Sequence, residues 1–92
     1  MDETFEKLKD ALNKISINEF VYWNDCRPTF ELFYSYKDKL KKEFKDKADM
    51  FEELCNTESQ QDFLRVLRKY ETEEDKKHIW VHENEDGYLY LV

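Results

Sequence analysis

Histidine and cysteine side chains are the first candidates for metal or nucleophilic chemistry in this chain of 92 residues. His78 and His82 are spaced i and i+4, which on a helix would let both imidazoles bind one metal ion. We place them on a strand, where a rise of about 3.3 Å per residue puts them roughly 13 Å apart, too far to share an ion. Cys26 and Cys55 belong to no CxxC motif and no Cys/His cluster. We therefore expect no metal site, reduced cysteines, and a core position for Cys55.

Carboxylates are the next candidates, because the chain has 22 Asp and Glu residues. Acid–base catalysis needs carboxylates in a cleft with shifted pKa values, and one small core leaves little room for a cleft. No serine or cysteine lies beside a recognisable nucleophile motif. The single glycine cannot build a phosphate-binding glycine loop. We therefore expect a protein that is not an enzyme and has no cofactor.

The charge pattern speaks against direct binding of nucleic acid. Lys and Arg number 15, so the net charge is −7. Acidic stretches at 48–64 and 71–92 alternate with basic stretches at 37–47 and 65–70. A bare DNA-binding protein should be basic, because it must neutralise phosphates. An acidic surface instead steers toward basic partners, although the same charge also serves solubility alone.

The first half of the chain favours helices. An apolar stripe predicts a helix over 2–15. Residues 18–23 are β-branched and aromatic, which favours a short strand. Pro28 suits the first turn of a second helix, whose apolar spacing continues from 29 to about 55. The stripe weakens near 46–49, where we expect a break.

The second half predicts one helix and a hairpin. Thr57, with a glutamine three residues later, resembles a capping box for a helix over 58–71. Residues 72–77 are polar and are expected to form a connector. The last fifteen residues alternate around a turn at 83–87, where Gly87 can adopt the positive φ that a hairpin loop needs.

The hairpin should have two unlike faces. One face, expected to pack on the helices, carries Ile79, Val81, Leu89 and Leu91. The other face carries Trp80, Tyr88 and Tyr90. Such an aromatic face is either a partner or dimer surface, or it is covered by a helix of the same chain. The sequence leaves both alternatives open.

The predicted fold class is α+β in a single domain, 1–92. It has three helices, or four if the second one breaks, a C-terminal hairpin, and a third short strand at 18–23. This order is also that of a winged-helix domain, but its third helix begins with Glu58 and Asp62, and its wing carries three acids, all of which would repel phosphates. No apolar run approaches the roughly 18 residues of a membrane span, and the first residues are acidic. We expect a cytoplasmic protein without membrane contact.

Acid density on rigid helices suggests imitation of DNA. Duplex DNA presents one negative charge per roughly 1.7 Å of axis. If the acidic stretches line one edge, they would offer phosphate-like charges to a basic DNA-binding groove and occlude it, with a strength that falls as salt rises. The candidate partner-binding residues are Asp49, Glu52, Glu53, Glu58, Asp62, Glu71, Glu73, Glu74, Asp75, Glu83, Glu85 and Asp86.

In length, acidic balance and its glycine-poor composition rich in Lys, Asp, Glu, Asn and Tyr, the chain resembles the anti-restriction nuclease proteins of T-even bacteriophages, which are small acidic DNA mimics. The resemblance implies inhibition of a host modification-dependent restriction endonuclease, contact with a host nucleoid protein, a homodimer, and a location in the host cell cytoplasm. The lysine-rich stretch 37–47 departs from a purely acidic mimic.

Two other functions remain open. A dedicated inhibitor of the immunity or antitoxin type would plug one toxic enzyme with its acids and the face of Trp80, Tyr88 and Tyr90. A winged-helix regulator would bind duplex DNA itself. Added duplex would compete with a DNA mimic but not with a dedicated plug, and a gel shift would reveal the regulator.

Overall fold

The computed structural model describes residues 2–92. Its first helix matches the sequence prediction. Helix α1 spans Glu3–Lys14 and buries Leu8 and Leu12. Asp2 is its N-cap and accepts a hydrogen bond from the backbone N–H of Phe5. A carboxylate at this position satisfies a free N–H group and stabilises the positive end of the helix dipole.

The strand predicted over 18–23 is wrong, because this segment is helix α2, Ile17–Asn24. Ser16 caps the helix by accepting a hydrogen bond from the backbone N–H of Glu19. Ile17, Phe20 and Val21 are buried, and this spacing places them on one helical face. Tertiary burial thus overrides the strand propensity of β-branched and aromatic residues.

The long helix predicted from 29 to 55 consists of separate pieces. These are α3 (Cys26–Ser35), α4 (Lys37–Glu43), the short 3₁₀ helix η1 (Lys45–Lys47) and α5 (Ala48–Cys55). The break expected near 46–49 is therefore present, and a further one lies at Tyr36. Helix α5 folds back against both α3 and α4. A straight helix could not bring their buried residues together in one core.

The region after α5 corrects two further expectations. Helix α6 spans Gln60–Lys69, and its N-cap is Ser59 rather than Thr57, whose hydroxyl donates to the carbonyl oxygen of Leu54. The predicted connector 72–77 is mostly helical, as α7, Glu73–His78. A capping box between Thr72 and Asp75 begins that helix, and it allows six polar residues to form a helical turn.

The C-terminal hairpin is confirmed. Strand β1 (Val81–Glu83) pairs antiparallel with β2 (Leu89–Leu91), and Gly87 has a φ of 83° in the turn. The side chain of Gln61 on α6 donates to the carbonyl oxygen of Leu89 at 2.7 Å and accepts from its N–H at 2.9 Å. This amide therefore occupies the free edge of β2 and ties the hairpin to α6.

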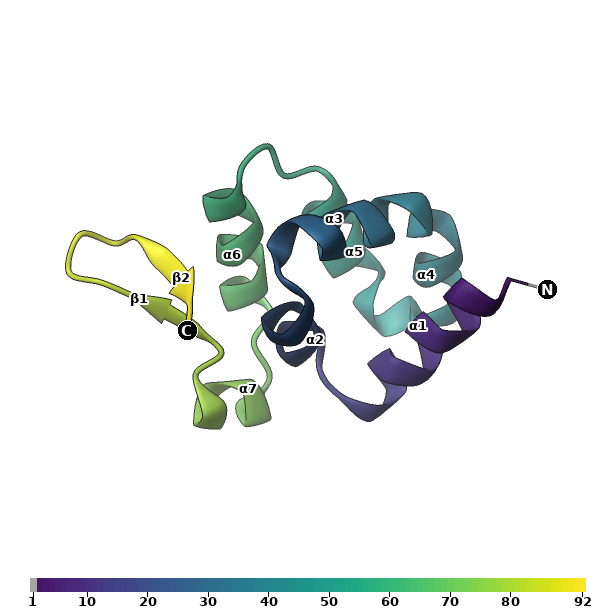
Figure 1. Ribbon diagram of the computed structural model, residues 1–92, viewed down its shortest axis with the longest axis horizontal. Coiled ribbons are helices and arrows are strands. Elements are labelled where there is room, and N and C mark those ends of the chain that lie inside the picture. The colour runs from purple at the N-terminus through teal and green to yellow at the C-terminus, as the bar shows by residue number, and fades with distance from the viewer. Residues whose placement is uncertain (1) are drawn as a thin grey trace.

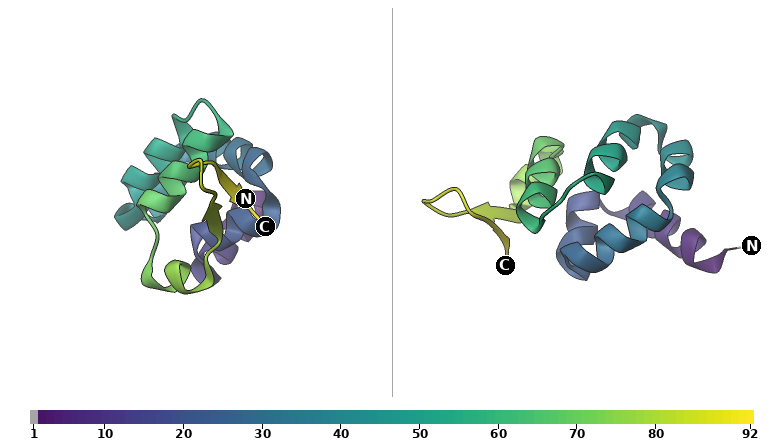
Figure 2. Two further views of the ribbon diagram at one scale, coloured as in Figure 1. Left: turned by 90° about the vertical axis from the view of Figure 1, so that its left-hand side faces the viewer. Right: turned by 90° about the horizontal axis from the view of Figure 1, so that it is seen from above.

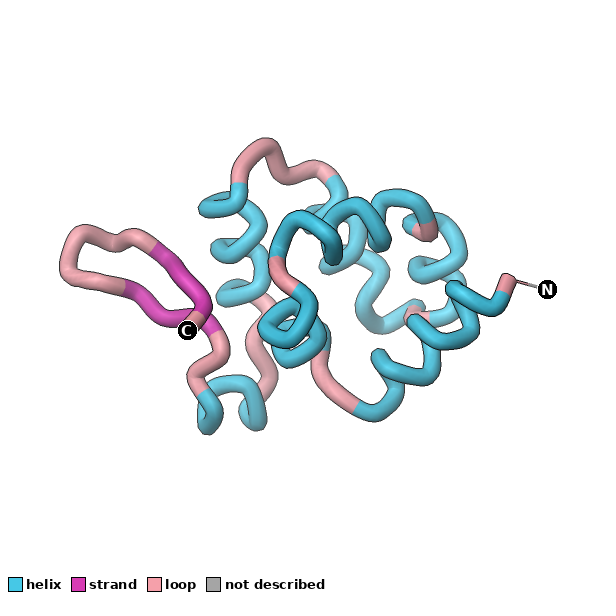
Figure 3. The backbone as a smooth tube through the Cα atoms, viewed as in Figure 1, coloured by secondary structure: helices cyan, strands magenta, loops and turns pink. Residues whose placement is uncertain are grey.

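The buried apolar side chains of residues 2–92 form one cluster. Both strands contribute to it, and so does every α-helix except α7. The molecule is elongated, with extents of 46 × 27 × 21 Å. Figures 1 and 2 show the N-terminus and the hairpin at opposite ends of the long axis. Figure 3 shows that the segments between them are nearly all helical. The fold is therefore α+β, with more helices than predicted. Within residues 2–92, no helix is long and apolar enough to cross a membrane.

Candidate functional site

The net charge is confined to one half of the chain. Residues 1–47 contain ten acidic and ten basic residues, whereas residues 48–92 contain twelve acidic and five basic residues. The second half, which comprises α5, α6, α7 and the hairpin, therefore carries the whole charge of −7. The hairpin and α7 lie at one end of the molecule, and α1 and α4 lie toward the other (Figure 1). The acids of α7 and the hairpin therefore lie at one end of the molecule, whereas those of α5 lie where that helix packs against α3 and α4.

Ion pairing sharpens the difference between the two halves of the chain. Every basic side chain of residues 48–92 already contacts a carboxylate of the same half: Arg65 with Asp62, Arg68 with Glu71 and Glu83, Lys69 with Glu53, Lys76 with Glu73, and Lys77 with Glu74. In the first half, within the described residues, six lysines have no carboxylate within 4 Å, namely Lys7, Lys14, Lys39, Lys42, Lys45 and Lys47. Unpaired positive charge therefore belongs to the first half only.

Two of the twelve candidate acids hold the helices together. Glu52 on α5 pairs with Lys37 and with Lys41, at 3.0 Å for Lys41, and so joins α5 to α4. Hydrogen bonds from Lys37 first and Lys41 second lower the pKa of Glu52 to about 2. Glu53 accepts hydrogen bonds from Lys69, which lowers its pKa most, and from Tyr70. Both carboxylates are already engaged by the protein itself.

Asp75 does not belong on a partner-binding surface. Its side chain is 2% exposed. One carboxylate oxygen accepts from the Ser16 hydroxyl, and the other accepts from the backbone N–H of Thr72 at 3.1 Å. Asp75 therefore joins the starts of α7 and α2. The sequence prediction counted this acid as a contact because it took 72–77 for an exposed connector.

The remaining nine candidates reach solvent to different degrees. Glu71 is largely covered where it pairs with Arg68, while Asp62, Glu73, Glu74 and Glu83 are exposed and paired. Four acids are exposed with no basic group within 4 Å among residues 2–92: Asp49, Glu58, Glu85 and Asp86. They come from the start of α5, the loop before α6 and the hairpin turn. The twelve carboxylates thus do not make one unbroken row of free charges.

Aromatic side chains accompany these acids at the hairpin end. Val81 and Leu89 are buried and Leu91 partly so, as predicted for the inner face. Ile79 does not join them, because it adopts a left-handed conformation with φ 52° and is 54% exposed. On the other face, Tyr88 and Tyr90 are exposed. Trp80, which belongs to the same face, packs against Tyr22 of α2. A helix therefore covers part of this face, and the two tyrosines leave the rest open to solvent.

Sequence reasoning missed the aromatic residues of α2. The ring of Tyr22 lies 4.9 Å from that of Trp80 and 5.1 Å from that of Trp23, measured between centroids. The ring of His78 stacks on that of Trp80, with 5.2 Å between the centroids. The assignment of 18–23 as a strand hid this grouping. A helical reading from the Ser16 cap would have placed Tyr22 and Trp23 at its exposed end.

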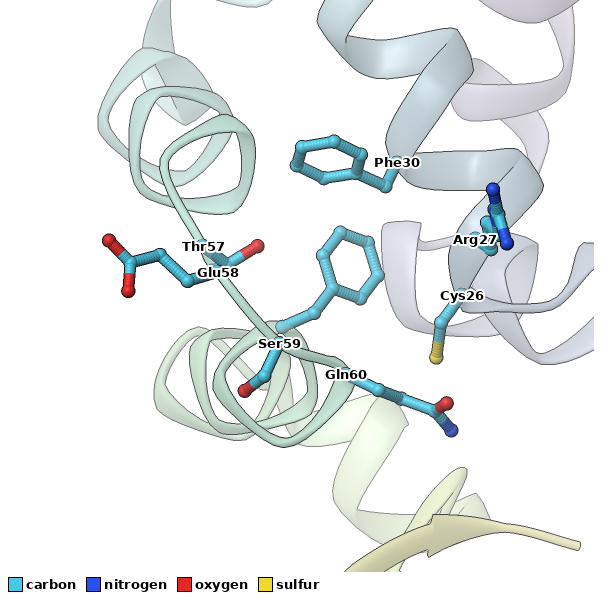
Figure 4. A pocket seen from close by; sticks show the side chains of 8 residues that line it. Cys26, Arg27, Phe30, Thr57, Glu58, Ser59 and Gln60 are labelled. Atoms are coloured by element: carbon cyan, nitrogen blue, oxygen red, sulfur yellow. The ribbon is translucent and has the colours of Figure 1, made fainter.

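The cavity beside Cys26 is lined by residues of α3 and of the loop and first turn of α6. It has a volume of about 260 Å³ and lies between α3 and the loop before α6, with Arg27 and Glu58 on opposite sides and Cys26 at its edge (Figure 4). Burial, and then the charge of Asp25, raises the pKa of the Cys26 thiol to about 11, so its nucleophilic thiolate is scarce at neutral pH. Within residues 2–92, no three His, Cys, Asp or Glu side chains are grouped to hold a metal ion.

Comparison of the chain with protein families, characterised proteins and solved structures finds no match.

Proposed function

We propose that the protein is a DNA-mimic inhibitor, which binds a basic DNA-binding protein through its acidic half and occludes the DNA site. The supporting observation is that residues 48–92 carry the entire charge of −7 and leave no basic side chain unpaired. The charge that this half leaves uncompensated is therefore negative only. The field of such a half steers a basic protein toward it and orients the encounter.

The free carboxylates stand on firmly held backbone. Asn84 accepts hydrogen bonds from the N–H groups of Asp86 and Tyr88, both at 2.9 Å, which fixes the hairpin turn. Glu58 lies between two residues that are held in place. The Thr57 hydroxyl donates to the carbonyl oxygen of Leu54 in α5, and the Ser59 hydroxyl caps α6. Because the backbone is already ordered here, binding needs to order only the carboxylate side chains. They can stand in for phosphates where a basic groove expects them.

The exposed tyrosines favour a second candidate, the dedicated protein plug. Tyr88 and Tyr90 are exposed and follow the turn that carries Glu85 and Asp86. Tyrosines are enriched among the residues that dominate protein–protein binding energy, whereas a pure charge mimic does not need them. The plug would bind one enzyme tightly, and added duplex would displace it little.

The test uses a modification-dependent restriction endonuclease that cuts methylated plasmid, and, separately, a nucleoid protein bound to labelled duplex. The protein should inhibit cleavage or displace the duplex at stoichiometric ratios, and the effect should weaken at higher salt and with competitor duplex. Inhibition that ignores competitor duplex favours the plug. No effect on either target, or a gel shift of duplex by the protein alone, would overturn the proposal.

A further inference from the structure

Four side chains from two distant segments form a surface cluster, which we term the aromatic corner: Tyr22, Trp23, His78 and Trp80. The planes of Tyr22 and Trp23 meet at 88°, so the two rings form two walls of a corner. Trp80 lies against Tyr22, and His78 stacks on Trp80 with an interplanar angle of 26°. The corner therefore joins α2 to the end of α7 and to the residue before β1.

Trp23 is the unusual member, because 67% of it is exposed. Its indole N–H donates to the Glu19 carboxylate at 3.4 Å, which holds the ring upright beside Tyr22. An indole ring that stays in water contributes little hydrophobic stabilisation to the fold. Tryptophan at such a position is typical of binding surfaces.

The charge on the α2 side of the corner is negative, whereas on the α7 side Lys76 and Lys77 precede His78 and pair with Glu73 and Glu74. Glu19 and Asp25 flank Trp23 in the sequence, and neither has a basic group within 4 Å among residues 2–92. Helix α2 contains no lysine or arginine. An aromatic face with nearby carboxylates attracts a cation electrostatically, both through the ring quadrupole and through the negative charges.

The backbone beside the corner is strained. Ile79 adopts a left-handed conformation, φ 52° and ψ 65°, at the end of α7. A β-branched residue pays a steric penalty there, and glycine or asparagine normally takes this position. The turn sends the chain back so that Trp80 reaches Tyr22. Strain of this kind is typical of functional sites.

We propose that the aromatic corner binds an arginine side chain of the basic partner. The guanidinium stacks on the exposed ring of Trp23 while its N–H groups donate to the Glu19 carboxylate. Arginine fits better than lysine, because its planar, weakly hydrated cation stacks on a ring and offers donors at its edge at the same time. This inference rests on the proposed function, since it names the residue by which the basic partner is recognised.

The test follows the two indole N–H resonances of the ¹⁵N-labelled protein, which has only two tryptophans. Hexa-arginine and hexalysine serve as probes of equal charge. Hexa-arginine should shift the Trp23 resonance and bind about threefold or more tighter than hexalysine. Trp23→Leu should weaken hexa-arginine binding about fivefold and hexalysine binding less than about twofold.

Tyr34→Leu is the matched control, because Tyr34 is similarly exposed, at 62%, but lies beside Lys37 and Lys39. It should leave both affinities unchanged. Equal binding of the two peptides, or equal losses in both variants, would overturn the arginine site. Failure of the site while endonuclease inhibition persists would leave the DNA-mimic proposal standing. Arginine binding without inhibition would reject that proposal and keep the site.

Discussion

Replacement of Asp75 by alanine should destabilise the fold without weakening partner binding. The side chain is 2% exposed and accepts one hydrogen bond from the Ser16 hydroxyl and one from the backbone N–H of Thr72. Hydrogen bonds to a charged group contribute about 1.5–3 kcal/mol each. Removal of both leaves two partly buried donors unpaired, so we expect a loss of about 3 kcal/mol.

That loss should lower the melting temperature by roughly 12–24 °C for a domain of this size. It is measurable by urea unfolding followed by far-ultraviolet circular dichroism, with the linear extrapolation to water. Asp75→Asn keeps one acceptor oxygen and should lose about half as much. A double-mutant cycle with Ser16→Ala isolates the contact between α2 and α7.

Two results would refute this reasoning. A loss below about 0.5 kcal/mol in Asp75→Ala would mean that the carboxylate does not join the two helix starts. A folded Asp75→Ala protein that inhibits the target poorly would return Asp75 to the contact surface.

Three further outcomes follow from the structure. Ile79→Asn should stabilise the protein by about 1 kcal/mol in urea unfolding, because asparagine tolerates the left-handed conformation and Ile79 buries little; a loss of stability would contradict the strain. Gly87→Ala should cost about 1 kcal/mol through the positive φ alone, since a Cβ would meet only the Glu83 carboxylate at an ordinary 3.7 Å. The pKa of Glu52 is lowered from 4.5 to about 2 in the folded protein. Its stabilising effect is therefore complete above the unfolded pKa and is lost as the pH falls toward 2. Glu52→Gln should make the midpoint of urea unfolding depend less on pH across this range.

Local patterns were enough to predict α1, α6 and the hairpin. Each has a regular apolar stripe or, at Gly87, a residue whose conformational freedom marks the turn. Helix α7 was also readable in principle, because Thr72 and Asp75 have the spacing of a capping box. Its lack of apolar residues led to the connector assignment instead.

Other features depended on the tertiary structure. Residues 18–23 have strand propensity, yet burial of Phe20 and Val21 on one face selects a helix. The break at Tyr36 has no glycine or proline to announce it. Ion pairs such as Lys37 with Glu52 and Lys69 with Glu53 join residues far apart in the sequence. Composition could therefore predict an acidic surface, but not which carboxylates are free.

The most direct test of the acidic half as the contact surface compares two charge-reversed proteins in the endonuclease assay. One carries Glu85→Lys and Asp86→Lys at the hairpin turn, and the other carries Asp10→Lys and Asp38→Lys in the first half of the chain. All four acids are exposed, and both variants change the net charge equally. We predict that inhibition weakens at least about tenfold in the hairpin variant and less than about twofold in the other. Equal weakening in both would contradict a localised contact surface and leave only the net charge as the cause.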